Sequence, residues 1–155
     1  MASIANGSPT VALDLLADIR DGQARNQAMA GILQGWSLSD PEGAARYLLG
    51  PAAGEFLSLL HVPVAAWMAI DPTAAAAFID QAQPGRERDQ AVWVAILELV
   101  RHDASLADAA LAEDLYARIE DEESRQNAAA ALARHFEDYD EERAEKYRAA
   151  AGIAR

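Results

Sequence analysis

The sequence contains no cysteine, and Lys146 is its single lysine. Without cysteine there can be no disulfide bridge, no thiolate nucleophile and no cysteine-ligated zinc or iron–sulfur site. A protein without disulfides fits the reducing cytosol, so we expect a cytoplasmic localisation.

Long apolar runs are also missing. The most apolar stretch, residues 56–70, is interrupted by His61 and Pro63, and it is shorter than the roughly 20 residues of a transmembrane helix. Residues 1–7 have neither the basic nor the apolar part of a secretory signal. We therefore expect no membrane partner.

Positive charge is scarce as well. The chain carries 13 basic residues against 25 acidic ones, a formal net charge of −12. Such a balance repels the phosphates of nucleic acids and of anionic membranes, so neither is an expected partner. It favours solubility or a basic protein partner.

The usual motifs of catalysis and metal binding do not occur. The sequence has no phosphate-cradling glycine loop, no His-Glu-x-x-His motif and no nucleophile elbow. The acidic segment 137–142 lacks the spacing and central glycine of a calcium-binding EF-hand loop, which favours a solvated helix start over a calcium site or a surface for a basic partner. We predict no catalytic residue, metal or cofactor, and no enzymatic activity.

What remains is rich in helix formers. Apolar residues make up 52% of the 155 residues and aromatic residues only 6%, because much of the apolar share is alanine. Alanine is the best helix former, and no segment alternates between polar and apolar residues with the period of a strand. The length suits one domain with a buried core. We predict a single all-α domain, residues 1–155.

Helix-start signals recur along the chain at nearly constant intervals. A serine or aspartate, often followed by proline, supplies an N-cap oxygen and a first helical residue that needs no N–H. By the numbering these positions are 32, 31, 32 and 37 residues apart. They are Ser8, Asp40, Asp71, Asp103 and Asp140.

Residues around these positions recur in register. Four residues after them stand Ala12, Ala44, Ala75, Ala107 and Ala144, and seven after them stand Leu15, Tyr47, Phe78, Ala110 and Tyr147. The residues before the four aspartate caps recur too. Four residues before them stand Trp36, Trp67, Leu99 and Phe136, and eight before them stand Ile32, Pro63, Ala95 and Leu132. Twelve before them stand Ala28, Leu59, Ala91 and Ala128. Steps of three and four place residues on one buried helix face.

The repeat predicts stacked helical hairpins, each of which buries its apolar face against its neighbours. The expected helices span about 8–20, 23–38, 41–49, 55–70, 72–83, 86–102, 104–119, 122–137 and 140–151, in repeats of about 8–22, 23–54, 55–85, 86–120 and 121–155. The nearly all-apolar stretch 91–100 is expected to lie deepest. The predicted fold is a right-handed α–α superhelix, a short α-solenoid of about four hairpins with an N-terminal capping helix.

Two stretches resemble known bacterial helical repeats. The segment 121–132, with an acidic turn before Arg125 and an alanine- and leucine-rich helix, resembles the second helix of a short HEAT-like repeat. The spacing of tryptophan, Asp-Pro and alanine in 67–75 resembles Trp…Asp-Pro helical-hairpin repeats, and tetratricopeptide repeats are more weakly similar. This resemblance covers about residues 8–152 and implies an interaction scaffold without catalytic residues.

The repeat also aligns three arginines. Arg25, Arg88 and Arg125 each precede a cap by fifteen residues, where the second hairpin has Phe56. A row of guanidinium groups would bind a carboxylate or phosphate partner, and the simpler alternative is an ion pair or a bond to a helix C-terminal carbonyl. Trp93 lies off the buried stripe, so it is a candidate for ligand stacking as well as for packing.

Histidines raise one further hypothesis. Glu98 and His102 lie four residues apart, at a spacing that suits two metal ligands, and His61 stands near Pro63 where the second hairpin departs from the repeat. Pro63 indicates either a functional bend or a late helix start. His102 and His135 also suit the last turn of a helix, where the dipole favours a cation.

Three functions therefore remain open. The first is a non-enzymatic module that binds a protein or peptide through a groove or an acidic surface, with Arg25, Arg88, Arg125, Trp93 and His61 as candidate binding residues. The second is a small metal-binding or hydrolytic enzyme that uses His61, Glu98 and His102. The third is an acidic mimic of nucleic acid that inhibits a DNA-binding protein.

Overall fold

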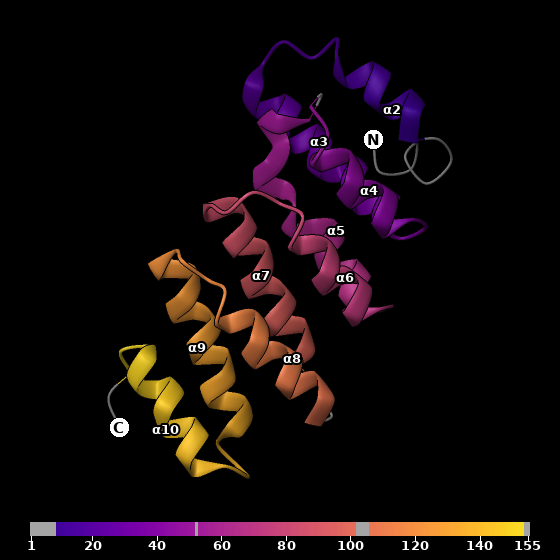
Figure 1. Ribbon diagram of the computed structural model, residues 1–155. Helices are drawn as coiled ribbons and strands as arrows, with labels where there is room; N and C mark the ends of the chain where they lie inside the picture. The colour runs from indigo at the N-terminus through magenta and orange to yellow at the C-terminus, as the bar shows by residue number, and fades with distance from the viewer. Residues whose placement is uncertain (1–8, 52, 102–105, 154–155) are drawn as a thin grey trace. The chain divides into compact units, whose positions relative to one another are not determined.

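The structure is a computed structural model that describes residues 9–51, 53–101 and 106–153. Every regular element in these ranges is helical, which confirms the all-α prediction (Figure 1). In chain order the elements are α2 (Pro9–Leu16), α3 (Gly22–Ser37), α4 (Pro41–Leu48), the 3-10 helix η1 (Gly54–Leu59), α5 (His61–Met68), α6 (Pro72–Ile79), α7 (Arg86–Leu99), α8 (Leu106–Tyr116), α9 (Glu122–Phe136) and α10 (Glu141–Ala150).

The chain forms two compact units. Unit 1 is Met1–Trp67 and unit 2 is Met68–Arg155. In unit 1, α3 packs against α2, α4 and η1; in unit 2, α7 packs against α6, α8 and α9, and α9 packs against α10. Figure 1 shows α7 beside α8 and α9 beside α10. The expectation that the whole chain is one repeat domain stays a prediction.

The predicted N-caps are confirmed wherever the structure describes them. Each of the carboxylates of Asp40, Asp71 and Asp140 accepts a hydrogen bond from the backbone N–H of the residue three positions later in the chain. The distances are 2.8, 2.9 and 3.0 Å. Ser8 and Asp103 lie outside the described residues. Two further carboxylates, Asp21 and Asp121, cap α3 and α9 in the same way. Capping depends on residues only three apart, which is why the sequence predicts it well.

The alanine that follows each cap by four residues is a contact point between helices. Its copies in the described part of the chain are fully buried; they are Ala12, Ala44, Ala75 and Ala144. The burial of Ala107 lies outside that part. A methyl side chain lets the neighbouring helix approach closely, so this position needs a small residue.

The position seven residues after each cap is less uniform. Phe78 and Tyr147 are buried there and Tyr47 is half-buried, as expected. Leu15 and Ala110 are exposed, so the prediction of a buried face at this position is wrong for those copies. In α2 the buried place is taken by Leu16, one residue further on, because α2 packs mainly on α3.

The stripe predicted on the first helix of each hairpin is largely buried. The position eight residues before the cap is buried in every hairpin, and Trp67, Leu99 and Phe136 are buried four residues later. Twelve residues before the cap, Ala91 and Ala128 are buried, but Ala28 and Leu59 are only half-buried. Trp36 is also only half-buried. Its ring lies 5.7 Å from that of Tyr47, and its Nε1 donates a hydrogen bond to the cap Asp40 at 3.4 Å. The indole therefore braces the turn between α3 and α4.

The second hairpin differs from its expected form. A single helix over 55–70 was expected, but the chain forms η1 and then α5, which begins at His61. Pro63 is the third residue of α5, where its missing N–H costs no helical hydrogen bond. The proline thus marks a late helix start and requires no bend.

The apolar stretch 91–100 forms most of α7, with neighbours on several sides. Ala91, Val92, Ala95, Ile96 and Leu99 are buried, and the remaining residues of the stretch are half-buried. None of the helices that the structure describes has the length and apolar character needed to span a bilayer.

Candidate functional site

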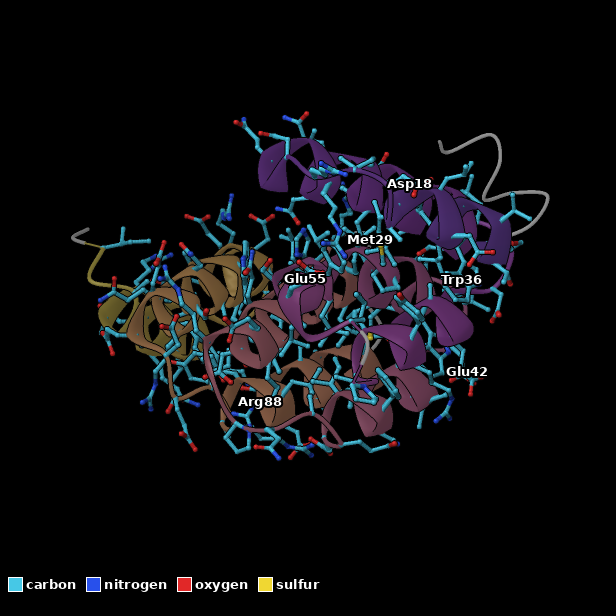
Figure 2. The ribbon with its side chains drawn as sticks, turned by 90° about the horizontal axis from the view of Figure 1, so that it is seen from above. Asp18, Met29, Trp36, Glu42, Glu55 and Arg88 are labelled. Carbon is cyan, nitrogen blue, oxygen red and sulfur yellow. The ribbon has the colours of Figure 1, made fainter. Side chains whose placement is uncertain are left out.

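The three arginines that the repeat aligns have three different environments. Arg25 on α3 forms an ion pair with Glu55 of η1 at 3.0 Å (Glu55 is labelled in Figure 2), and its guanidinium lies 5.7 Å from the centre of the Phe56 ring. Its Nε is buried without a hydrogen-bond acceptor in the described part of the chain. Arg25 thus joins α3 to η1.

Arg88, also labelled in Figure 2, belongs to a buried polar cluster in unit 2. Its Nε and Nη2 donate to Asp89 Oδ1 at 2.9 and 2.7 Å, and Nη2 also donates to the carbonyl of Arg118 at 2.8 Å. Asp89 is 0% exposed, and its Oδ2 accepts the backbone N–H groups of Glu120 and Asp121, each at 2.8 Å. The pair therefore holds the turn between α8 and α9 against α7.

Arg125 is exposed on α9, with its guanidinium 5.9 Å from the centre of the Tyr116 ring. Equal spacing in the sequence thus does not produce equal contacts. For Arg88 the alternative of an ion pair and a carbonyl bond is the observed one. A shared anion site of the three arginines stays a prediction, which none of these contacts requires.

The other residues predicted to bind a ligand or a metal have surroundings that give no indication of such a site. Trp93 on α7 is half-buried. His61 begins α5, and its Nδ1 lies 2.9 Å from the carbonyl oxygen of Ser58, a local contact at the helix start. Glu98 pairs with Arg101 at 2.9 Å, and His102 lies outside the described residues. In the described ranges no three histidine or acidic side chains are grouped to hold a metal ion.

One hollow of unit 2 is a groove between α9 and α10. We call it the α9–α10 groove; it has a volume of about 690 Å³. Its lining residues are Ala130, Ala133, Arg134, Glu137, Glu141, Arg148 and Ile153. We call its apolar lining residues, Ala130, Ala133 and Ile153, the floor; the other four lining residues are charged.

Local sequence positions some of the lining residues within their own segments. Ala130, Ala133 and Arg134 are three and four residues apart on α9, so they occupy one face of adjacent helical turns. After α10, Gly152 adopts a left-handed backbone with φ of +69°, and Ile153 N–H donates to the carbonyl of Arg148 at 3.0 Å. This is a Schellman C-cap, and it turns Ile153 back to the groove.

The charges in the groove are unequally satisfied. Arg148 is 19% exposed and pairs with Glu141 at 3.0 Å and with Glu137 at 3.5 Å. Arg134 is exposed; its Nε donates to the carbonyl of Ala130 at 3.2 Å, and no carboxylate of the described residues lies within ion-pair distance of its guanidinium. Arg134 is therefore the cation of this groove that is available to a ligand.

A smaller hollow of about 280 Å³ adjoins the groove through Arg134. It lies between α7 and α9 and is lined by Leu97, Val100, Arg101, Ala131, Arg134 and His135. His135 Nε2 and the Tyr139 hydroxyl share a hydrogen bond, and burial lowers the pKa of His135 below its usual 6.5. Burial also raises the pKa of Tyr139. The lowered pKa favours the neutral form of His135, which lines this smaller hollow and not the α9–α10 groove.

A third hollow, also of about 690 Å³, lies between α8 and α10 and is lined by Glu113, Asp140, Glu142, Arg143 and Lys146. Tyr147 is buried, and its hydroxyl donates a hydrogen bond to Glu113 at 2.8 Å. The pKa of Tyr147 is strongly raised, mainly by desolvation and to a smaller extent by this hydrogen bond. Arg143 lies 3.7 Å from Glu113, and Lys146 Nζ lies 4.6 Å from the centre of the Tyr147 ring. Arg143 thus pairs with a carboxylate, whereas Arg134 has only the Ala130 carbonyl as a partner among the described residues.

None of the five candidate binding residues predicted from the sequence lines the α9–α10 groove, but Glu137 and Glu141 belong to the acidic segment 137–142, whose composition also allowed a surface for a basic partner. Two signals pointed to the groove only weakly, namely the run of alanines in 128–133 and the glycine at 152 near the end of the last expected helix. The groove depends on how α9 and α10 meet, which no single segment reveals. Comparison with known protein families, curated proteins and solved structures found no match.

Proposed function

We propose that this protein is a non-enzymatic binding module whose α9–α10 groove holds a segment of a protein or peptide. In this proposal the hairpins form a right-handed superhelix, a short α-solenoid of the HEAT-like or Trp…Asp-Pro type. The regular spacing of the caps and the buried alanines supports that arrangement.

The observation that supports this proposal most is an apolar floor beside the Arg134 guanidinium, which has no carboxylate partner among the described residues. Because Ala130 and Ala133 have small side chains, a peptide backbone can approach the floor closely, while Arg134 offers charged hydrogen-bond donors to the ligand. Apolar grooves with a few oriented polar groups are typical of ligand sites.

The charge of the surroundings bears on the partner. Unit 2 contains 19 acidic and 10 basic residues, a net charge of −9, whereas unit 1 contains 6 and 3, a net charge of −3. Such a field accelerates the approach of a cationic partner and slows that of an anionic one. A basic protein or peptide is therefore the favoured partner.

Filling the groove tests the proposal. Ala130→Tyr places a phenol over the floor, and Ala110→Tyr is the control because Ala110 is an exposed alanine on α8 outside the groove. Selection from a library of random displayed peptides is expected to enrich binders for the unmodified protein and for Ala110→Tyr. Binding of those peptides is expected to fall by roughly tenfold or more in Ala130→Tyr.

Two results would overturn the proposal. One is the absence of any enriched peptide. The other is equal binding of the enriched peptides to Ala130→Tyr, with circular dichroism showing that both variants keep the helix content of the unmodified protein.

A further inference from the structure

We propose that the α9–α10 groove recognises the C-terminal end of a basic polypeptide: Arg134 binds the terminal carboxylate, and the last side chain, an apolar one, lies on the alanine floor. This inference rests on the proposed function and specifies its ligand. It follows from three features of the groove.

The first feature is the free guanidinium. Arg148 is engaged by Glu137 and Glu141, which leaves Arg134 as the groove cation without a carboxylate among the described residues. The planar guanidinium offers paired N–H donors that match the two oxygens of a carboxylate. The groove therefore has one vacant position for one negative charge.

The second feature is the short distance between that position and the floor. Ala130, Ala133 and Arg134 share one helix face within adjacent turns. The ligand must therefore present its carboxylate and its apolar group close together. A C-terminal residue does so, because both groups are attached to the same Cα. In an extended chain an internal acidic side chain and its neighbour point to opposite faces.

The third feature is the remaining charge. The net charge of −9 in unit 2 disfavours a ligand with several acids, but every polypeptide ends in one carboxylate whatever its composition. Glu137 and Glu141 at the rim are 58% and 65% exposed, so they remain accessible to lysine or arginine side chains upstream of the terminus. A basic tail with an apolar last residue matches both charges.

The test compares one peptide pool in two chemical forms. The pool has the sequence KXKXL with X randomised and a fluorescent label at the N-terminus, and it is made as the free acid and as the C-terminal amide. Fluorescence polarisation is expected to detect binding of the free acid, and amidation is expected to weaken it roughly tenfold or more, because it removes a charged hydrogen-bond acceptor.

Two variants test whether Arg134 causes the preference for the free acid. Arg134→Gln is expected to bind both pools equally and weakly, because it lacks the guanidinium that binds the free carboxylate but not the amide. Arg125→Gln removes another exposed arginine of the same helix, outside the groove, and is expected to keep the preference for the free acid. A preference that survives Arg134→Gln would overturn the inference.

The outcomes separate this inference from the proposed function. Equal binding of acid and amide, or no binding of either pool, overturns recognition of the terminus. The proposed function would still stand if displayed peptides with blocked ends bind and Ala130→Tyr abolishes that binding. If neither the pools nor the displayed peptides bind, both proposals fail.

Discussion

Asp89 has the most demanding environment of any single residue described in unit 2. Its carboxylate is 0% exposed and accepts hydrogen bonds from Arg88 and from two backbone N–H groups at the start of α9. Burying a charge is costly unless it is paired and hydrogen-bonded in this way. The pair therefore specifies where the α8–α9 turn sits on α7, a role that equal spacing of arginines did not predict.

Removing this carboxylate should destabilise the protein strongly. Asp89→Ala leaves the Arg88 guanidinium and two backbone donors without their acceptor, which is expected to lower the free energy of unfolding by about 3–5 kcal/mol. Urea denaturation measures it. Glu123→Ala is the control, because it breaks the exposed ion pair with Arg86 and should cost less than about 1 kcal/mol. Equal losses in the two variants would contradict this account.

His135 should make stability depend on pH. Its pKa is lowered in the folded protein by burial, so the unfolded chain binds the proton more readily. Its contribution to stability is therefore fully present above the unfolded pKa near 6.5 and is lost as the pH falls through the folded value. The other charged residues that line the same hollow, Arg101 and Arg134, are cations, so neither provides a negative charge that would raise the pKa of His135 again.

This dependence is measured as the difference between the unmodified protein and His135→Gln. Urea denaturation between pH 7.5 and 5 should show a steeper loss of stability in the unmodified protein, and an NMR titration should give a pKa below 6.5 for His135. Parallel stability curves for the two proteins would show that His135 does not titrate as inferred.

Among the elements, the end of α10 depends on one backbone conformation. Gly152 has φ of +69°, and a Cβ added there would have no heavy atom within 4 Å, so the cost of Gly152→Ala is conformational rather than steric. We expect a loss of about 1–2 kcal/mol in the free energy of unfolding. We also expect weaker peptide binding, because Ile153 would leave the groove.

Gly22→Ala is the matched control for this substitution. Gly22 lies in the first turn of α3 without a left-handed backbone, and a Cβ there also has no neighbour within 4 Å. Replacing it should stabilise the protein by a few tenths of a kcal/mol. A thermal-denaturation comparison in which both variants shift in the same direction would refute the argument.

At the scale of the whole molecule, stability should vary along the chain. Helix α7 packs against α6, α8 and α9, whereas α2 packs mainly on α3 and exposes Val11 by 50% and Leu15 by 44%. Local opening requires less free energy where fewer apolar contacts are lost. Hydrogen–deuterium exchange with mass spectrometry should therefore find the slowest amides in α7 and α9 and fast exchange in α2. Uniform protection along the chain would contradict this expectation.

The helical class and most helix starts were predictable from the sequence. An aspartate cap such as Asp71 and the proline after it act on backbone groups within four residues, so their effect does not depend on the rest of the molecule. The registered alanines were predictable for a similar reason, because the helical period places them on one face. The exposure of Leu15 was not predictable, because packing partners rather than spacing decided it, and the late start of α5 was one of the two alternatives that Pro63 left open.

Tertiary structure alone decided the roles of the arginines and the position of the groove. Arg25, Arg88 and Arg125 share one register, but each meets different neighbours, so a carboxylate, a buried cluster and an aromatic ring became their partners. Arg134 became a candidate ligand contact because Glu137 and Glu141 pair with Arg148, and no carboxylate of the described residues pairs with Arg134. Capping is local chemistry, whereas pairing depends on which helices meet.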